Sequence, residues 1–310
     1  MQQKRYYNDY GSWIRRVFPE FRVQKIGLDA GFSCPNRDGL IGTGGCVYCD
    51  NSSFSPSYCG GRKSIAEQIR DGKEFFQRKY PSMRYLAYFQ SFTNTYAPLH
   101  RLQALYEEAL GCDDVVGIVI GTRPDMMPAE VLDYLESLSR RTFVVVEYGI
   151  ESVFDETLRR INRGHTFGQA RETIEATAAR GITVGGHVIL GLPGEDEEMM
   201  IRQAEIISDT SLQILKLHQM QVLRGTKLAD IYASQPFKTF SVDEYIHLIA
   251  RYIQHLRRDI IIERFTSQSP PQQLIAPQWG LKNHEFTAKL LRHLHETDAW
   301  QGKMLNSNKP

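Results

Sequence analysis

The chain has 310 residues, of which 42% are hydrophobic and 24% charged, and its formal net charge is +1. This is the composition of an ordinary globular protein, and the near-zero charge excludes a global electrostatic attraction to nucleic acid or to a membrane surface. No apolar run approaches the length of a membrane span, and residues 1–7 lack the apolar core of a signal peptide. The five cysteines are an odd number with three clustered, which argues against a secreted disulfide framework. We therefore expect a cytoplasmic protein with no membrane partner.

A basic and aromatic leader, residues 13–18, predicts a short helix ahead of the first strand. Short β-rich runs then alternate with longer helical patterns. The expected strands are 23–29, 85–90, 115–120, 143–148, 183–190 and 214–221. The expected helices between them are 65–78, 99–110, 128–140, 167–180 and 195–208. Beyond them follow a helix near 241–257, a short apolar run at 260–262, a loop rich in proline and glutamine, and a helix near 284–295.

Six strand–helix units in series predict a parallel α/β sheet with right-handed crossovers. Since a closed barrel of this kind has eight units, we expect a partial (β/α)6 TIM-like barrel, whose active site lies in the loops after the strands. The expected organisation is a leader at 1–22, the barrel at 23–240 with a cysteine loop at 30–53, and an extension at 241–310 that covers the barrel. The sequence does not set the oligomeric state.

Three cysteines, Cys34, Cys46 and Cys49, share the glycine-rich loop after the first expected strand. A structural zinc site needs four protein ligands, whereas an iron–sulfur cluster held by three cysteines leaves one iron open to a small molecule. A zinc site completed from elsewhere, for example by Cys59, is the alternative that the residue pattern leaves open. Cys59 and Cys112 are otherwise expected to be ordinary thiols.

The loop and the motifs after the later strands resemble a radical S-adenosylmethionine (radical SAM) enzyme of the YhcC-like group. That group is related to the elongator catalytic subunit and to oxygen-independent coproporphyrinogen oxidase. The eleven residues between Cys34 and Cys46, the segment Asp29–Gly39 and the C-terminal segment Leu274–Trp279 carry the resemblance, which covers nearly the whole chain. It implies a [4Fe–4S] cluster ligated by the three cysteines. The open iron would bind S-adenosylmethionine, and one electron from a flavodoxin- or ferredoxin-type donor would give a 5′-deoxyadenosyl radical.

The resemblance also implies a set of cofactor-binding residues. Tyr48 matches an aromatic position near adenine, and Gly191 lies in a turn that packs near the same ring. The family's glycine-rich segment, which holds the cofactor's amino group, is replaced here by a sequence that contains Gln90, Ser91 and Thr93.

Three further positions match residues that face the cofactor's ribose or carboxylate. Glu151 matches a ribose ligand, Arg163 matches the residue that holds the carboxylate, and His187 stands where a relative uses an aspartate toward ribose. Arg123 and Asp125 either belong to the same site or pair with one another and cap the next helix.

Two observations concern the barrel interior. Glu147 lies in an apolar strand, and a buried carboxylate is costly without a partner, so we expect a cationic partner inside the barrel. Lys216 and His218 alternate on the sixth strand and should share one face, where they either meet substrate or form a hydrogen-bonded core pair.

Kinship with the elongator catalytic subunit implies tRNA as substrate, at a side chain of a wobble uridine. Arginine clusters at 15–16, 159–163 and 257–258 are candidate phosphate contacts. A radical reaction on a small-molecule metabolite is the alternative, and a non-enzymatic zinc or iron–sulfur scaffold is the alternative of a different class.

Overall fold

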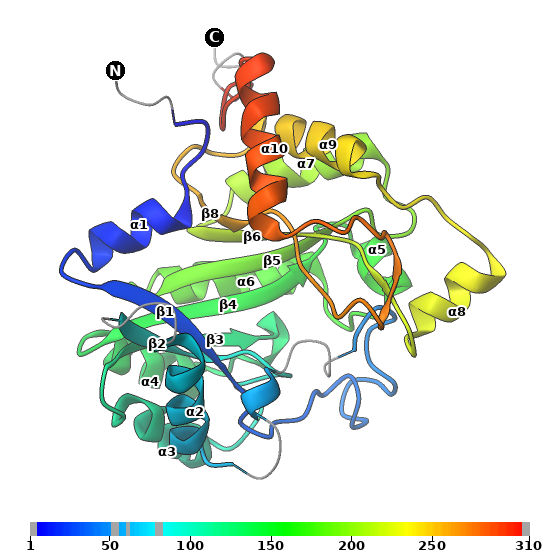
Figure 1. Ribbon diagram of the computed structural model, residues 1–310. Coiled ribbons are helices and arrows are strands. Elements are labelled where there is room, and N and C mark those ends of the chain that lie inside the picture. The colour runs from blue at the N-terminus through cyan, green and yellow to red at the C-terminus, as the bar shows by residue number, and fades with distance from the viewer. Residues whose placement is uncertain (1–4, 51–55, 60–62, 78–82, 306–310) are drawn as a thin grey trace.

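The computed structural model describes residues 5–50, 56–59, 63–77 and 83–305. Its centre is a seven-stranded sheet in the order β1-β2-β3-β4-β5-β6-β8, with every neighbouring pair parallel. These strands are β1 (Arg22–Leu28), β2 (Met83–Phe89), β3 (Val115–Thr122), β4 (Phe143–Glu151), β5 (Thr183–Leu190), β6 (Ile214–Gln219) and β8 (Ile261–Arg264). The sheet curls into a half-barrel (Figure 1). The predicted partial barrel is confirmed, with one strand more than the six expected.

Most of the helices cover the convex side of the sheet, whereas α1 packs at its inner face, and short elements gather near the cysteine loop (Figure 1). The helices are α1 (Tyr10–Val17), α2 (Ile65–Gln77), α3 (Leu99–Leu110), α4 (Ala129–Ser139), α5 (Asp155–Arg160), α6 (Phe167–Ala178), α7 (Glu197–Ser208), α8 (Lys227–Ser234), α9 (Val242–Gln254) and α10 (Asn283–Glu296). Single 3-10 turns form at Ser57–Cys59 and Pro124–Met126. A small antiparallel ribbon joins β7 (Val222–Leu223) to β9 (Leu274–Ala276). None of the described helices is long and apolar enough to cross a membrane.

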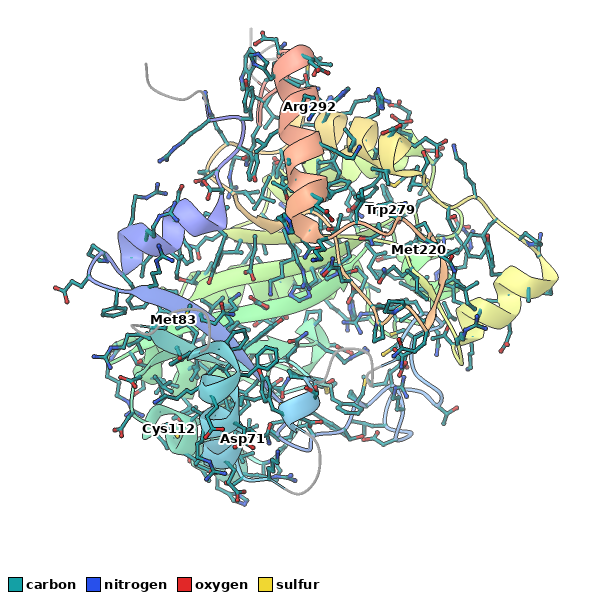
Figure 2. The ribbon with its side chains drawn as sticks, in the orientation of Figure 1. Asp71, Met83, Cys112, Met220, Trp279 and Arg292 are labelled. Atoms are coloured by element: carbon teal, nitrogen blue, oxygen red, sulfur yellow. The ribbon has the colours of Figure 1, made fainter. Side chains whose placement is uncertain are left out.

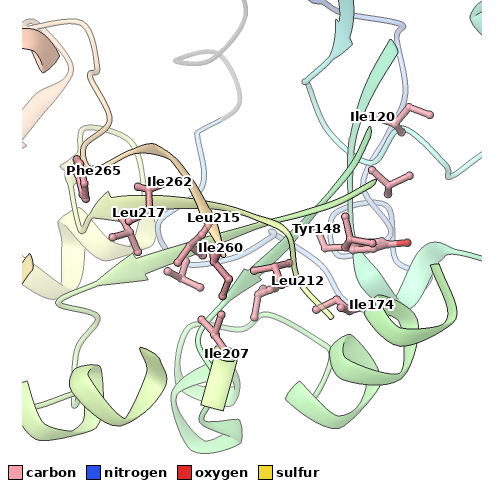
Figure 3. Close-up of a cluster of buried hydrophobic side chains, with 14 of the residues drawn as sticks. Ile120, Tyr148, Ile174, Ile207, Leu212, Leu215, Leu217, Ile260, Ile262 and Phe265 are labelled. Atoms are coloured by element: carbon pink, nitrogen blue, oxygen red, sulfur yellow. The ribbon is translucent and has the colours of Figure 1, made fainter. Parts of the chain in front are cut away.

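The largest core lies between the sheet and its outer helices. Strand side chains alternate between two faces, so one residue in two of each strand points to this core. Figure 3 shows part of it, with Leu215 and Leu217 of β6 beside Ile262 of β8 and Ile207 of α7. Burial of this apolar face fixes the register of the sheet.

The inner face of the sheet is filled in layers. An apolar floor includes Leu86, Val119 and Val145, and Ile14 of α1 packs into the same cluster. Asp9 is the N-cap residue of α1, and its carboxylate accepts from the Ser12 amide at 2.8 Å in the first turn. The leader therefore forms the predicted short helix, and this helix packs on the floor of the half-barrel.

The first and last parts of the described chain are joined at one edge of the sheet. Gln301, which is 1% exposed, donates its side-chain amide to the carbonyl oxygens of Arg257 and Ile260 at 2.7 and 2.8 Å. Its side-chain oxygen accepts from the Asn8 amide at 2.9 Å. Asp9 forms a β-bridge with Ile262 of β8. The edge strand β8 is thus held by both ends of the chain.

Candidate functional site

A cavity of about 200 Å³ lies at the carboxyl ends of the parallel strands, where the fold is expected to carry its chemistry. The cysteine loop after β1 forms one wall, and residues at or after the carboxyl ends of β2 to β6 and β8 form the others. Nine of the eleven side chains predicted to bind cluster or cofactor line it: Cys34, Cys46, Tyr48, Cys49, Gln90, Thr93, Glu151, Arg163 and His187.

The described part of the cysteine loop, residues 30–50, contains no helix and no strand of the main sheet, and it is held by hydrogen bonds to other segments. The Val47 amide donates to the Ile161 carbonyl at 3.0 Å, and the Leu228 amide donates to the Val47 carbonyl at 2.8 Å. Asn162 donates its side-chain amide to the Gly45 carbonyl at 2.8 Å. These bonds attach the loop to the segment after α5 and to the start of α8, and so position the three thiols.

Two of the loop glycines are required by the geometry. A Cβ added to Gly42 would lie 2.5 Å from the side-chain oxygen of Asn36, so only glycine fits there. Gly45 has φ +74°, a left-handed conformation that other residues adopt only with strain. These two glycines let the backbone turn tightly beside the thiols.

The surroundings of the thiols suit an anionic group. Asn36 Nδ2 lies 3.6 Å from Cys46 Sγ, and Arg163 Nη1 lies 3.7 Å from the same sulfur. The Arg37 guanidinium donates to the Cys49 carbonyl at 2.7 Å. Burial raises the pKa of Cys49 to about 11, and Arg37 opposes that shift. N–H donors and positive charge around three thiolates are what an iron–sulfur cluster needs to hold its negative charge.

Within the described residues, no three histidine, cysteine, aspartate or glutamate side chains converge to hold one metal ion. A cluster makes a different demand, because each of its thiolates binds a different iron and the sulfurs need not meet at a point. Cys59, the candidate fourth zinc ligand, lies outside the cavity wall and donates its thiol to the Gly27 carbonyl at 3.2 Å. The donor set therefore fits a three-cysteine cluster better than a zinc ion.

Arg163 and Glu151 face each other beside Tyr48. An Arg163 nitrogen lies 3.6 Å from a Glu151 oxygen, and Arg163 Nη2 donates to the Gly149 carbonyl at 2.6 Å. Burial raises the pKa of Glu151, while Arg163 and a hydrogen bond from Tyr48 lower it. Glu151 has φ +68° at the end of β4, a strained conformation that costs about 1–3 kcal/mol. Backbone strain of this kind is found most often at ligand-binding and active sites.

Arg123 lies on the same cavity wall and holds the backbone of Arg163 in this pair. Its guanidinium pairs with both oxygens of Asp125, at 2.9 and 2.8 Å, and its Nη2 also donates to the Arg163 carbonyl at 2.8 Å. The pairing of Arg123 with Asp125 is therefore confirmed, but Arg123 also lines the cavity, so the pair and the site do not exclude each other. Asp125 does not cap α4, whose N-cap residue is Pro128. Arg123 acts as a positioning residue for the backbone that carries Arg163.

The loop after β2 places Gln90, Phe92 and Thr93 on the cavity wall. Phe92 has φ +64°, so this residue adopts the left-handed backbone that glycine takes without strain. The hydroxyl of Thr93 is buried and has no hydrogen-bond partner among the described residues. Such a group is normally satisfied, which makes it a candidate ligand contact.

An ionic layer lies above the apolar floor of the half-barrel. A Glu147 oxygen lies 2.6 Å from Lys216 Nζ, the other oxygen lies 2.9 Å from Lys25 Nζ, and His187 Nε2 is 3.0 Å from the first. Lys25 also pairs with Glu263 at 2.7 Å. The predicted cationic partner of Glu147 is confirmed, and there are two of them.

His187 and His218 stack with ring centroids 5.3 Å apart, and both line the cavity. Burial, together with Lys216, lowers the pKa of His187 to about 4, so its ring is neutral at pH 7. Its contact with the Glu147 carboxylate therefore uses the proton on Nε2 and leaves Nδ1 as an acceptor. Lys216 forms ion pairs with Glu147 and Glu263, whereas His218 lies on the cavity wall. The two residues, which alternate on β6, therefore have different surroundings.

Ser91 and Gly191 are the two predicted cofactor residues that do not line the cavity. Ser91 is 1% exposed, and a Cβ on Gly191 would meet the Phe240 ring at 2.8 Å. Their cofactor role stays a prediction.

Cys112 lies far from the cavity-lining Met220 (Figure 2), and its thiol donates to the Glu108 carbonyl at 3.4 Å.

Several residues of the site were not expected from the sequence: Asn36, Arg37, Tyr88 and Arg264. Asn36 and Arg37 lie within the recognised cysteine motif, so their position was a usable signal. Arg264 had none, because its strand β8 read only as a short apolar run.

Comparison with known proteins gives a consistent result. Residues 39–205 match the pattern described as the radical SAM superfamily, and residues 212–296 match its C-terminal domain. Protein YtqA of Bacillus subtilis is 37% identical over 283 residues, which are 91% of this chain and 88% of YtqA. Protein YhcC of Escherichia coli is 34% identical over 297 residues, which are 96% of this chain and 94% of YhcC.

A solved structure of Elp3 from the archaeon Methanocaldococcus infernus has the same fold, with a TM-score of 0.69 and 16% identity. The match covers 90% of this chain and 64% of the Elp3 chain.

Proposed function

Because the chain belongs to the radical SAM superfamily and is a radical SAM enzyme, we propose that it cleaves S-adenosylmethionine in the cavity described above and modifies the side chain of a wobble uridine in tRNA. The observation that carries the first part is the placement of Cys34, Cys46 and Cys49 on one wall of a cavity that also holds Arg163. The family implies both S-adenosylmethionine and a [4Fe–4S] cluster.

Each group of residues has a task in this proposal. The three thiolates would ligate the cluster, and Asn36 and Arg163 would donate to Cys46 Sγ, an interaction that tunes the potential of a thiolate-bound cluster. When bound, the cluster would supply the one electron needed to break the bond between the sulfur and C5′ of S-adenosylmethionine, which would give methionine and the 5′-deoxyadenosyl radical. The protein's own part is to orient the cofactor and exclude water.

The polar residues of the wall suit the zwitterionic part of the cofactor. Arg163 Nε and the Thr93 hydroxyl are both buried without a partner among the described residues. A guanidinium suits a carboxylate, and a hydroxyl serves either an amino group or a carboxylate. Glu151 and Tyr48 would hold the ribose and the adenine side, and neutral His187 would offer its Nδ1 to a ribose hydroxyl.

The tRNA part of the proposal rests on the resemblance to the elongator catalytic subunit and on exposed arginines. Arg15 and Arg16 on α1 and Arg159 on α5 are exposed and available to phosphates. Arg257 is not, because its guanidinium donates to the carbonyls of Ser208, Thr210 and Leu212. A flavodoxin- or ferredoxin-type protein would supply the electron.

The first test is the formation of 5′-deoxyadenosine by anaerobically reconstituted protein with dithionite and S-adenosylmethionine, measured by mass spectrometry. Cys46→Ala should abolish the product, while Cys112→Ala, which removes a thiol outside the site, should leave it unchanged. Absence of product from wild-type protein with a full cluster would overturn the proposed chemistry.

A second test concerns the substrate. Bulk tRNA should raise 5′-deoxyadenosine formation and acquire a mass change in a wobble nucleoside. Its binding should weaken as salt rises, because phosphate contacts release counterions. Salt-independent binding, or stimulation only by a small metabolite extract, would favour the small-molecule reaction.

A further inference from the structure

Arg264 is the last residue of β8 and lines the same cavity. Strand β8 is one edge of the sheet, and β1 is the other edge. Its Nη2 donates to His218 Nε2 at 3.3 Å, and its Nε is buried without a hydrogen-bond partner among the described residues. Among the described ion pairs, none links Arg264 to a carboxylate. A partly buried guanidinium on a cavity wall is thus left with donors to spare.

The charges around Arg264 do not balance. Lys25 and Lys216 are matched by Glu147 and Glu263, whose oxygens lie 2.6–3.3 Å from the two ammonium groups. His187 and His218 are neutral at pH 7, because burial lowers the pKa of both. Arg264 is the remaining charge, so the β6–β8 side of the cavity carries a net positive charge with no counter-ion among the described residues.

An uncompensated cation in a half-buried site is costly, and an arginine cannot relieve the cost by losing its proton. We propose that Arg264, together with His218, binds an oxyanion of the substrate, which is a carboxylate or a phosphate. These two side chains would then fix the position of the substrate's anionic end, away from the atom that reacts. This deepens the proposed function and rests on it in one respect: the cavity is taken as the reaction site.

The geometry fits this task in two ways. The guanidinium presents a planar fork that matches the two oxygens of a carboxylate or phosphate. The bond from Arg264 makes His218 Nε2 an acceptor, so the proton of the neutral imidazole is on Nδ1 and is a second donor. The site is separate from that of Arg163, which follows β4, because two strands, β5 and β6, lie between β4 and β8 in the sheet.

Anion binding can be measured without turnover. The thermal midpoint of the protein would be recorded in acetate, inorganic phosphate and chloride at constant pH and ionic strength. We expect acetate or phosphate to raise the midpoint by roughly 3 °C over chloride, because a ligand that binds only the folded state stabilises it. Arg264→Gln should lose most of this response. Arg292→Gln, at an exposed position on α10 (Figure 2), should keep it.

The same variant separates a binding role from a structural one. If Arg264 serves a ligand, Arg264→Gln in chloride should have a midpoint equal to or above that of the wild type, since an unpaired charge has been removed. A full anion response in Arg264→Gln would overturn the proposal. If that variant does not fold, Arg264→Lys decides: it keeps the charge but loses the fork, so the response should fall severalfold, and an unchanged response would contradict us.

Two further arms identify the source of the anion. A response to acetate alone indicates a substrate carboxylate, and a response to phosphate alone indicates a substrate phosphate. S-Adenosylmethionine also carries a carboxylate, so its binding to cluster-loaded protein would be measured without reductant. Equal affinity in wild type and Arg264→Gln supports a substrate site, and a tenfold loss would assign Arg264 to the cofactor and overturn the proposal. These arms need neither 5′-deoxyadenosine nor tRNA, so a failure of the proposed function would be seen separately.

Discussion

The Glu147 side chain contacts three basic side chains in the barrel interior. Its carboxylate is fully buried and touches two ammonium groups and one imidazole. Buried ion pairs add little net stability when intact, but removal of one partner leaves the others uncompensated. The pKa of Glu147 is held well below its usual range by Lys216 and Lys25, which outweigh the effect of burial.

Glu147→Gln should therefore lower the free energy of unfolding by about 3–5 kcal/mol, because Lys216 loses its nearest countercharge. Urea denaturation of the cluster-loaded protein would measure it. Glu263→Gln is the matched comparison, since Glu263 is 14% exposed in its side chain and water screens the loss there. A loss below about 1 kcal/mol for Glu147→Gln would contradict the assigned network.

Glu195 lies just before α7, and its raised pKa leads us to expect that the stability of the fold depends on pH. Burial raises its pKa to about 7 from the ordinary value of 4.5, against hydrogen bonds from Ser152 and Thr157. Below pH 4.5 the carboxyl is protonated in both folded and unfolded chains. As pH rises toward 7 the unfolded chain ionises first, so the protein should lose about 1–3 kcal/mol of stability across that window. In Glu195→Gln this loss should disappear, and urea titrations between pH 4.5 and 7.5 would test it. An unchanged pH profile in the variant would assign the dependence to another group.

The sequence predicts some of these residues well and others not at all. The need for a cation beside Glu147 follows from its apolar strand alone. The identity of the partners does not, because Lys25 and Lys216 lie 122 and 69 residues away in sequence and meet Glu147 only once the sheet curls. Arg264 was missed for a related reason, since its place on the wall depends on the pairing of β8 with β6.

At the scale of elements, the predicted and observed bounds agree best for long helices and strands. Long periodic helices such as α3 (Leu99–Leu110) are found where predicted, residue for residue. The four-residue strand β8 and the two-residue β7 carry no periodicity, so their pairing partners alone define them. The short helices α5 and α8 were likewise unpredicted, and the two-stranded ribbon with them.

The cysteine loop depends on contacts rather than on regular structure, so a single added methyl group should disturb it. In Gly42→Ala the new Cβ meets Asn36, whose Nδ2 donates to the Asn162 carbonyl at 2.5 Å and lies near Cys46. We expect a loss of about 1–3 kcal/mol and lower iron retention after gel filtration, measured per protein together with the absorbance of the cluster.

Gly168→Ala is the control for that measurement. It lies in the first turn of α6, where a Cβ meets only the Thr166 hydroxyl at 3.7 Å. Since alanine is the better helix former, the control should be neutral or stabilised by up to about 1 kcal/mol. Equal iron retention in the two variants would refute the role given to the Gly42–Asn36 contact.

At the scale of the whole molecule, the half-barrel has two different edges. No strand pairing joins β1 to β8 among the described residues, and α1 packs against both strands. The edge at β8 is held by Asp9 and by Gln301. The partial barrel was predictable from its six repeating units, but this closure was not, because it joins segments at opposite ends of the chain.

Gln301→Leu tests the closure. The substitution would leave the Asn8 amide and the Ile260 carbonyl without a partner, each at a cost of about 1–3 kcal/mol where water cannot enter, while the Arg257 carbonyl would keep its hydrogen bond from the Ile260 amide. Thermal unfolding should move down by several degrees, and amide hydrogen exchange should accelerate at β8 more than at β4. Uniform exchange across both strands would argue against a local role for Gln301.

The joining of both chain ends at β8 also has a consequence for biosynthesis. Strand β6 is synthesised before β8, so the nascent chain carries β6 as an unprotected sheet edge until β8 is made. The contact of Asn8 at this edge is completed later still, because Gln301 is synthesised almost three hundred residues after it. Contacts of such wide sequence separation form slowly and leave apolar surface exposed in the meantime. The cysteines of residues 34–49, by contrast, emerge early and wait for strands that follow them. If the chain holds the proposed cluster, we expect it to be loaded only after the strands of the cavity wall have been made, so that the apo form comes first.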